Sequence, residues 1–345
     1  MTTFRGTKRD DTLIDRGPFD GPEYPTDDNT FQGFAGNDKI YVYQGNDTVY
    51  GGSGNDLIEL REGEELSVFQ QFGTYGPVLT ERSATYSDTV DAGSGNDTVL
   101  LGTGTNTVDG GKGYDILGFG LVGGGIQHST RYQYEITADK SAKLIVDLAA
   151  GTVSYAGIDS SITLYYFETP GVPSSRVDIG PFSATGLGAM NHAISNFEAV
   201  RGNPRGADIL RGSDRTDVVE VFTPGKAGAM GDALSNDRVD GRGGIDIVDY
   251  AREAYAVELD LSAKRAEGVE VTVGGVVFGG FTDTLIGIEG AFGTKLDDVL
   301  TGDANDNFFY GGKGADVLTG GAGFDIVTYT LGRLGTVDGG GIADL

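Results

Sequence analysis

Large apolar residues recur at every ninth position over long stretches of this chain. Residues 33–59 divide into three consecutive nonamers, GFAGNDKIY, VYQGNDTVY and GGSGNDLIE, and residues 92–118 and 293–328 divide in the same way. Apolar–polar alternation predicts a short strand, and the glycine-rich residues before it predict a turn. The pattern G-G-x-G-x-D-x-U-x, with U a large apolar residue, therefore predicts a chain that reverses direction every nine residues.

Weaker copies of the nonamer lie at 6–14, 24–32, 83–91, 203–211, 212–220, 232–240 and 241–249, which gives 17 copies in all. The sixth position is Asp in fourteen copies and Asn in three, and the eighth position is always apolar. Two nonamers complete one coil, so each copy should stack on the next but one, with strands ~4.8 Å apart. We expect eighth-position side chains such as Ile40, Val49 and Ile58 to fill the coil. A single coil cannot bury its apolar face, so the sequence predicts an all-β solenoid of stacked coils.

Glycine occupies the first, second and fourth positions of the nonamer. The chain holds 59 glycines in 345 residues, well above the usual share of about 7%. At all three positions we expect glycine to permit positive φ and a close approach of neighbouring backbone.

The composition excludes several classes of site and partner. The chain has no cysteine and two histidines, so it holds no disulfide or thiolate metal site and favours no histidine-rich one. The net charge of −26 would repel a phosphate backbone, so nucleic acid is not an expected partner. Hydrophobic residues make up 38% of the chain, which argues against disorder and for a buried core.

Stacking of the coils brings sixth-position carboxylates about one strand spacing apart. Two unit charges ~5 Å apart repel by roughly 1 kcal/mol in water and about 3 kcal/mol at an effective dielectric constant of ~20. Calcium takes oxygen ligands at ~2.4 Å, and twice that distance matches the strand spacing. Turn carbonyls can supply further oxygens, so calcium is the expected ion between coils.

The nonamer resembles the repeat of the RTX (repeats-in-toxin) calcium-binding proteins. This resemblance implies a right-handed parallel β-roll or β-helix, with irregular β-strand insertions here, and calcium between adjacent turns on both edges. It also implies release from a Gram-negative bacterium through a type I secretion channel, with an uncleaved C-terminal signal and folding only in external calcium. Extracellular calcium modules bind with Kd values of ~10⁻⁴–10⁻³ M, so folding would respond to calcium outside the cell.

Carried onto this sequence, the resemblance implies a set of calcium ligands and about six to eight ions. The sixth-position pairs are Asn29 with Asp47, Asp38 with Asp56, Asp88 with Asn106, Asp97 with Asp115, Asp208 with Asp237, Asp217 with Asp246, Asp298 with Asp316, and Asn307 with Asp325. Main-chain carbonyls would come from Gly36, Gly45, Gly52, Gly54, Gly93, Gly95, Gly102, Gly104, Gly111, Gly113, Gly244, Gly312, Gly314, Gly321 and Gly323.

Some copies depart from the repeat of the family. The third block is split by residues 221–231, so its pairs require that segment to loop out. Residues 15–23 (DRGPFDGPE) separate the first two copies, which leaves Asp11 without an expected partner. Asn at the sixth position offers one neutral oxygen and should weaken its site. The tail GTVDGGGIADL matches a secretion signal weakly.

The chain divides into five predicted regions. Residues 1–118 form a first β-roll region with an insertion at 60–82, 200–249 form the split block, and 291–345 form the last block and tail. Between them, 119–199 and 250–290 alternate apolar and polar residues and predict β-rich insertions. These insertions end alike, in ISNFEAVRG and LIGIEGAFG, and we interpret them as irregular strands that continue or cover the solenoid.

No catalytic motif stands out. His128 and His192 lie in no nucleophilic or zinc motif, and neither HExxH nor GxSxG occurs, which argues against the protease and lipase classes. Glu62, Glu64 and Glu65 favour a solvated loop over a glycosidase acid. The separation of their carboxylates, which a glycosidase site would require, cannot be read from sequence. The aromatic residues 165–167 favour strand core over sugar stacking.

Two hypotheses for function remain. The first is a secreted, non-enzymatic calcium-binding solenoid that serves as a structural, matrix, surface or adhesion component, with an extracellular polysaccharide or a cell surface as partner. The second is a polysaccharide-modifying enzyme, a lyase or epimerase, with its site in 119–199. The N-terminus lacks an apolar signal segment, and no apolar run reaches the ~20 residues of a membrane span, so we expect no cleaved leader and no transmembrane segment.

Overall fold

The computed structural model describes residues 2–14, 28–43, 45–60, 86–102, 104–119, 132–137, 143–156, 159–166, 175–183, 191–202, 207–221, 236–253, 255–269, 271–273, 276–278, 280–328 and 336–338. These residues form strands and turns, without any helix. None of them therefore belongs to a helix that could cross a membrane. The chain separates into two compact units, residues 1–139 with 154–196, and residues 140–153 with 197–345.

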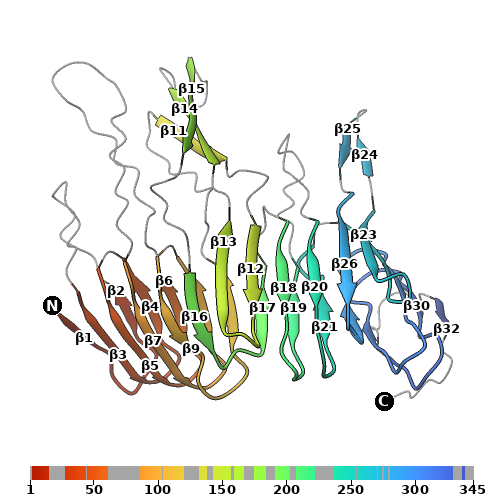
Figure 1. Ribbon diagram of the computed structural model, residues 1–345, viewed down its shortest axis with the longest axis horizontal. Helices are drawn as coiled ribbons and strands as arrows, with labels where there is room; N and C mark the ends of the chain where they lie inside the picture. Colours follow the sequence, from red (N-terminus) through yellow and green to blue (C-terminus); the bar gives the residue numbers. More distant parts are fainter. Residues whose placement is uncertain are drawn as a thin grey trace. The chain divides into compact units, whose positions relative to one another are not determined.

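The first unit is built from two parallel sheets that the chain visits alternately (Figure 1). One sheet has the order β1 (Thr3–Arg5), β3 (Thr30–Ala35), β5 (Thr48–Ser53), β7 (Thr89–Ser94), β9 (Thr107–Asp109) and β16 (Asn191–Ser195). The other has the order β2 (Thr12–Ile14), β4 (Lys39–Val42), β6 (Leu57–Leu60), β8 (Thr98–Leu101) and β10 (Ile116–Phe119). After β1, β3, β5, β7 and β9, where every connecting residue is described, a turn leads from one sheet to the other, as expected for a parallel β-roll.

The strand register confirms that each nonamer stacks on the next but one. Thr30 of β3 pairs with Thr48 of β5, and Lys39 of β4 pairs with Leu57 of β6. The insertion at 61–85 leaves this register intact, because Thr48 continues to Thr89 of β7. Because β5 and β7 pair across this insertion, a strand's partner is set by its place in the coil and not by the number of residues between the two strands.

Eighth-position side chains fill the space between the two sheets, as predicted. Phe31, Ile40, Val49 and Ile58 each have no exposed surface, and Val99 has none either. Neighbouring seventh- and ninth-position side chains point outward. In β4 and β6 each buried eighth-position residue therefore lies between exposed or half-buried ones.

The second unit also has two sheets (Figure 1). The first contains β12 (Lys143–Asp147), β18 (Ile209–Arg211), β20 (Arg238–Asp240), β26 (Thr282–Ile286), β23 (Arg265–Gly268), β22 (Val257–Asp260), β28 (Val299–Thr301), β30 (Val317–Thr319) and β32 (Thr336–Asp338), in that order. The second contains β17 (Ala199–Arg201), β19 (Val218–Glu220), β21 (Ile247–Asp249), β27 (Gly290–Phe292), β29 (Phe308–Tyr310) and β31 (Ile326–Thr328).

Antiparallel hairpins are inserted into this parallel stacking. β13 (Thr152–Ala156) follows β12 through a tight turn, and β23 follows β22 in the same way. In both turns an aspartate caps a main-chain N–H: Asp147 Oδ1 accepts from Ala150 and Asp260 Oδ1 from Ala263, each at 2.9 Å. The two insertions thus share the same aspartate-capped turn, in the sequences DLAAG and DLSAK.

The remaining strands lie outside the two-sheet coils. β11 (Tyr132–Thr137), β14 (Asp159–Tyr166) and β15 (Ser175–Ser183) form an antiparallel sheet in the first unit. β24 (Val271–Val273) and β25 (Val276–Phe278) form a hairpin in the second. The β-rich character predicted for both insertions is therefore observed.

Candidate metal-binding turns

Sixth-position aspartates form a buried ladder along each edge of the coils. The Asp38 N–H donates to Asp56 Oδ1, the Asp56 N–H to Asp97 Oδ1, and the Asp97 N–H to Asp115 Oδ1, each at 2.8 Å. All four side chains are buried. One oxygen of each carboxylate is therefore used to hold the preceding turn in place.

The same link recurs on the opposite edge and in the second unit. It joins Asn29 to Asp47, Asp47 to Asp88, Asp88 to Asn106, Asp208 to Asp237, Asp217 to Asp246, Asp298 to Asp316, and Asn307 to Asp325. Every pair that the sequence predicts is thus brought together through a hydrogen bond from one main chain to the next carboxylate or amide.

Asp11 was expected to lack a partner, and this expectation is wrong. Its N–H donates to Asp38 Oδ1 at 2.8 Å, although 27 residues separate the two. β2 pairs with β4 in register, with Leu13 opposite Ile40, so the stacking is kept across the intervening sequence. The Pro-rich segment therefore interrupts the sequence of repeats but not the ladder.

The second oxygen of the carboxylates in glycine-rich turns is left over. Oδ2 of Asp38, Asp56, Asp97, Asp246 and Asp325 is buried and has no hydrogen-bond partner within the described part of the chain. A buried, uncompensated carboxylate oxygen is costly, so native proteins supply it with a donor or a cation. The turns of Asp38, Asp56, Asp97 and Asp325 share this deficit, which indicates one common missing partner.

First-position glycines provide the space in which these oxygens lie. A Cβ on Gly51 would lie 2.6 Å from Asp56 Oδ2, and a Cβ on Gly241 equally far from Asp246 Oδ2. Neither glycine is among the residues with positive φ. Positive φ is therefore absent at these two first positions, but the expected close backbone approach is present, because a Cβ would also overlap the carbonyl oxygen of Ala92 at Gly51 and of Gly287 at Gly241. The glycine gives room beside both the carboxylate and that carbonyl.

Second- and fourth-position glycines do adopt positive φ, as expected. The angles are 113° at Gly52 and 131° at Gly54. A Cβ on either residue would overlap the carbonyl oxygen of the matching residue one coil earlier, that of Phe34 or Gly36. Successive turns therefore stack their carbonyls in columns beside the aspartate ladder, in contact distances that only glycine permits.

Burial is the main influence on the charge of the ladder. Burial, together with the smaller effect of the carboxylates of Asp56 and Asp115, raises the pKa of Asp97 to about 7, although the hydrogen bond from Asp56 acts to lower it. Burial likewise raises the pKa of Asp246 to about 7 and that of Asp298 to about 6. The folded chain without metal therefore holds these carboxylates at a cost that a cation or a proton would relieve.

These groups fit calcium as a ligand set. Three or more His, Asp or Glu side chains converge at no point among the described residues, so acidic side chains alone would not hold an ion. One or two aspartate oxygens together with columns of main-chain carbonyls give the all-oxygen environment that calcium prefers. The residues that would hold it are the sixth-position aspartates and the carbonyl-bearing glycines of the turns.

A second ladder, which sequence reasoning missed, runs along the fifth position. Asn37 Oδ1 accepts the Asn55 N–H at 2.7 Å, Asn55 Oδ1 the Asn96 N–H at 2.9 Å, and Asn96 Oδ1 the Tyr114 N–H at 3.1 Å. This ladder is exposed and runs opposite to the aspartate ladder, since here the earlier side chain accepts from the later backbone. The recurring Asn before Asp in the repeat was the available signal.

Three turns satisfy their aspartate internally. A second-position hydroxyl residue donates both N–H and hydroxyl to the carboxylate in the turns of Asp11, Asp217 and Asp298. The donors are Thr7, Ser213 and Thr294, and the N–H bond lengths are 2.5–2.6 Å. An aspartate that accepts hydrogen bonds from its own turn is thus observed in the G-S/T-x-x-x-D copies.

Three rungs of the ladders come from residues outside the nonamers. His192 Nδ1 accepts the Asn106 N–H at 3.1 Å, Asp283 Oδ1 the Asp237 N–H at 2.8 Å, and Glu289 Oε2 the Asp246 N–H at 2.9 Å. They lie in or just before the similar segments ISNFEAVRG and LIGIEGAFG. The similarity of these two segments was the available signal. The three residues could not be identified as ladder positions from it, because they lack the full set of glycines that precedes the sixth position in the repeat.

His192 and Asp283 are both buried beside the ladders. Burial lowers the pKa of His192 to about 4, so its imidazole is neutral while it accepts the main-chain hydrogen bond. Asp283 Oδ2 accepts the Tyr250 hydroxyl at 3.0 Å, and Tyr250 stacks on Phe281 with ring centroids 6.0 Å apart. Tyr250 therefore supplies the donor that Asp56 and Asp97 lack.

Several residues considered from sequence lie outside the description. His128, Glu62, Glu64, Glu65 and Phe167 fall outside the described residues. Tyr165 and Tyr166 are placed in β14. Gly36, Gly45, Gly104 and Gly244 lie in turns with positive φ, as do most of the carbonyl-bearing glycines named above.

Comparison with known protein families identifies the repeats. Residues 26–58, 84–117 and 292–327 match the model of the family described as RTX calcium-binding nonapeptide repeat (4 copies). These ranges hold the turns of the first unit and of the last block, whereas residues 203–249 lie outside the match. A search of curated proteins found no match.

Proposed function

Since this chain carries RTX calcium-binding nonapeptide repeats in a parallel β-roll, we propose that calcium completes its turns and drives its folding outside the cell. The observation that carries this proposal is the buried Oδ2 of Asp38, Asp56 and Asp97, which has no hydrogen-bond partner within the described residues and belongs to turns whose carbonyls stack on one another. In solution an ion between successive turns would neutralise these oxygens.

The proposed ligands are the sixth-position residues and turn glycines named above, and the proposed number of ions is about six to eight. At calcium concentrations ten times Kd, each site would add ~1.4 kcal/mol to the free energy of unfolding. Six sites would together add ~8 kcal/mol, which is comparable to the whole stability of a typical domain. The chain would therefore remain open at cytosolic calcium and fold at millimolar calcium.

For the biological role we propose a secreted, non-enzymatic structural component of a matrix or surface, exported by a type I system. The repeats of this family are typical of such exported proteins. An extracellular polysaccharide or a cell surface is the proposed partner. The sixth-position ladders run along both edges of the coils and link successive turns through hydrogen bonds, which supports a structural role.

The test is a calcium titration of the whole chain, followed by far-ultraviolet circular dichroism and calorimetry. We expect β-structure to appear with calcium, to disappear with EGTA, and the ion count to lie well above one. An unchanged spectrum in EGTA together with no heat of calcium binding would overturn the proposal. Incubation with acidic polysaccharides in the same samples tests the non-enzymatic role, since any turnover would contradict it.

A further inference from the structure

One rung of the second unit differs from the glycine-rich turns at its second position. The turns 212–217 and 241–246 stack on each other through the bond from the Asp217 N–H to Asp246 Oδ1. Where regular turns have glycine, these two carry Ser213 and Arg242. Arg242 is an exposed residue and Ser213 a half-buried one, and each donates to an acceptor of the turn 212–217.

Arg242 keeps the backbone conformation of the glycine it replaces. Its φ is 72°, in the left-handed region that non-glycine residues avoid, whereas Gly52 and Gly93 at the same position have 113° and 106°. A residue held in this conformation requires compensating contacts from its surroundings.

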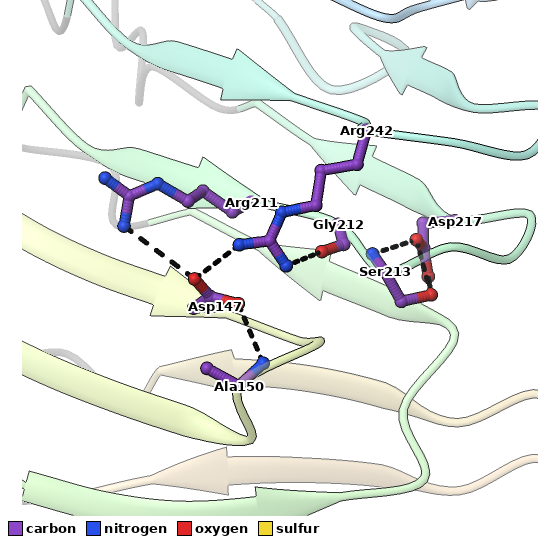
Figure 2. A network of polar contacts seen from close by, with 7 residues as sticks. All are labelled: Asp147, Ala150, Arg211, Gly212, Ser213, Asp217 and Arg242. Carbon is purple, nitrogen blue, oxygen red and sulfur yellow. Dashed lines mark hydrogen bonds and ion pairs between the residues drawn. The ribbon is translucent and has the colours of Figure 1, made fainter.

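The guanidinium of Arg242 provides these contacts. Nη1 donates to the carbonyl of Gly212 at 2.9 Å, and Nη2 donates to Asp147 Oδ2 at 2.6 Å (Figure 2). Gly212 is the first residue of the stacked turn, so the cation bridges that turn to the β12–β13 hairpin. Arg211 lies farther from the same carboxylate, at 3.9 Å, and contacts no turn carbonyl in Figure 2.

Ser213 occupies the acceptors on the other side of the rung. Its N–H and Oγ donate to Asp217 Oδ2 at 2.5 and 2.9 Å (Figure 2). The Asp217 carboxylate and the Gly212 carbonyl are thus both supplied with donors from the chain. Among the buried side-chain oxygens described in this rung, Asp246 Oδ2 alone is left over, and calcium requires six to eight oxygens.

The charge at this point also disfavours a metal ion. The acidic groups facing Arg242 are Asp147, Asp214 and Asp240, and they raise its pKa, so the guanidinium stays charged. Burial raises the pKa of Asp217, while the hydrogen bonds from Ser213 and then the charges of Arg215 and Arg242 lower it, so two cations reach the carboxylate expected to bind calcium. A divalent ion would have to share the rung with this fixed positive charge.

We propose that Arg242 is a built-in cation that replaces calcium between the turns 212–217 and 241–246. The inference rests on the proposed calcium-driven folding and departs from it at this rung, where Asp217 and Asp246 were expected as ligands. This rung forms without metal, while the glycine-rich turns of Asp56 and Asp97 require it. The second unit therefore contains a calcium-independent segment around β18 to β21.

The test is hydrogen exchange of the whole chain with and without EGTA, read at the N–H groups of Asp217 and Asp56. In wild type we expect the Asp217 N–H to keep its protection in EGTA and the Asp56 N–H to lose it at least tenfold. Arg242→Gly restores a glycine second position and should make protection at Asp217 depend on calcium. Arg211→Gly is the matched control, because it removes an arginine beside the same Asp147 carboxylate but no bond to the turn.

The outcomes separate this inference from the proposed function. Equal loss of protection at Asp217 and Asp56 in EGTA would overturn the role of Arg242, while calcium-driven folding would stand. Equal protection at both sites with and without EGTA would overturn calcium-driven folding itself. If Arg242→Gly is unfolded in EGTA, native mass spectrometry in calcium decides: one more ion than wild type supports the replacement, and an unchanged count contradicts it.

Discussion

The main-chain N–H of Asp56 donates to Oδ1 of Asp97 at 2.8 Å, across 41 residues of sequence. The same bond joins Asp38 to Asp56 over 18 residues. Aspartate at the sixth position therefore has two separable tasks, since one oxygen holds the preceding turn and the other faces the stacked carbonyls. Substitutions can distinguish these tasks.

Asp97→Asn should preserve the hydrogen bond to Asp56 and remove the charge that calcium would neutralise. We expect the variant to fold with a calcium midpoint raised several-fold, because an amide contributes one neutral oxygen to the site. Asp97→Ala removes both functions and should cost a further ~1–3 kcal/mol in calcium, since the buried Asp56 N–H loses its acceptor. Calcium titrations followed by circular dichroism measure the midpoints, and chemical unfolding in saturating calcium measures the stability.

The control for these variants is Asp91→Ala, at the exposed ninth position of β7. Its carboxylate is outside the coil, so its midpoint should remain that of wild type. Equal midpoints for Asp97→Asn and Asp91→Ala would contradict a metal-facing role for Asp97.

Gly51→Ala tests whether the first-position glycine makes room for the carboxylate. The added Cβ would lie 2.6 Å from Asp56 Oδ2, and the position needs no positive φ. We expect a loss of about 1–3 kcal/mol from overpacking, together with weaker calcium binding, because Oδ2 must move. Thermal unfolding and calorimetry measure the two effects.

Ser53→Ala is the matched control, because Ser53 is an exposed residue of the same turn. It should change neither melting temperature nor calcium affinity measurably. If Gly51→Ala behaved like Ser53→Ala, the first-position glycine would have no role beside the carboxylate.

Much of the fold was predictable because its signal is local and periodic. The nine-residue spacing places Ile40 and Val49 inside the coil, and their burial confirms it. The ladder partner of Asp11 was not predictable, because residues 15–23 break the nine-residue spacing between its copy and the next. The structure identifies this partner through the pairing of β2 with β4.

The predicted site was right in which sixth positions meet, but incomplete in how their oxygens are satisfied. Ser213 and Arg242 stand where the repeat has its second-position glycine, and each supplies a donor to the rung. Tyr250 and Asp283 lie 33 residues apart in a segment without the repeat, so no periodic signal connects them. Such contacts depend on the three-dimensional stacking, which the sequence pattern describes only for regular copies.

Tyr250→Phe should destabilise the second unit to the same extent with and without calcium. The hydroxyl donates to the fully buried Asp283 Oδ2 at 3.0 Å, so its removal leaves that oxygen unsatisfied at a cost of about 1–3 kcal/mol. Urea unfolding of the second unit, followed by hydrogen exchange at the Asp237 N–H, measures the loss. Tyr50→Phe, at a side chain that is 45% exposed, should be neutral, and a loss that vanished in calcium would show that Asp283 binds the ion instead.

Acid should partly substitute for calcium in the folded chain. Burial raises the pKa of Asp97 to about 7 from 3.8, so the folded state binds this proton more tightly than the unfolded state. Its stabilising effect is complete below pH 3.8 and is lost as pH rises through about 7. His192 opposes it below its ordinary pKa of 6.5, because burial lowers that pKa to about 4. We therefore expect EGTA-treated protein to gain β-structure as pH falls from 8 to 6.5, and Asp97→Asn to gain less. An equal gain in both proteins would exclude Asp97 as a source of the pH dependence.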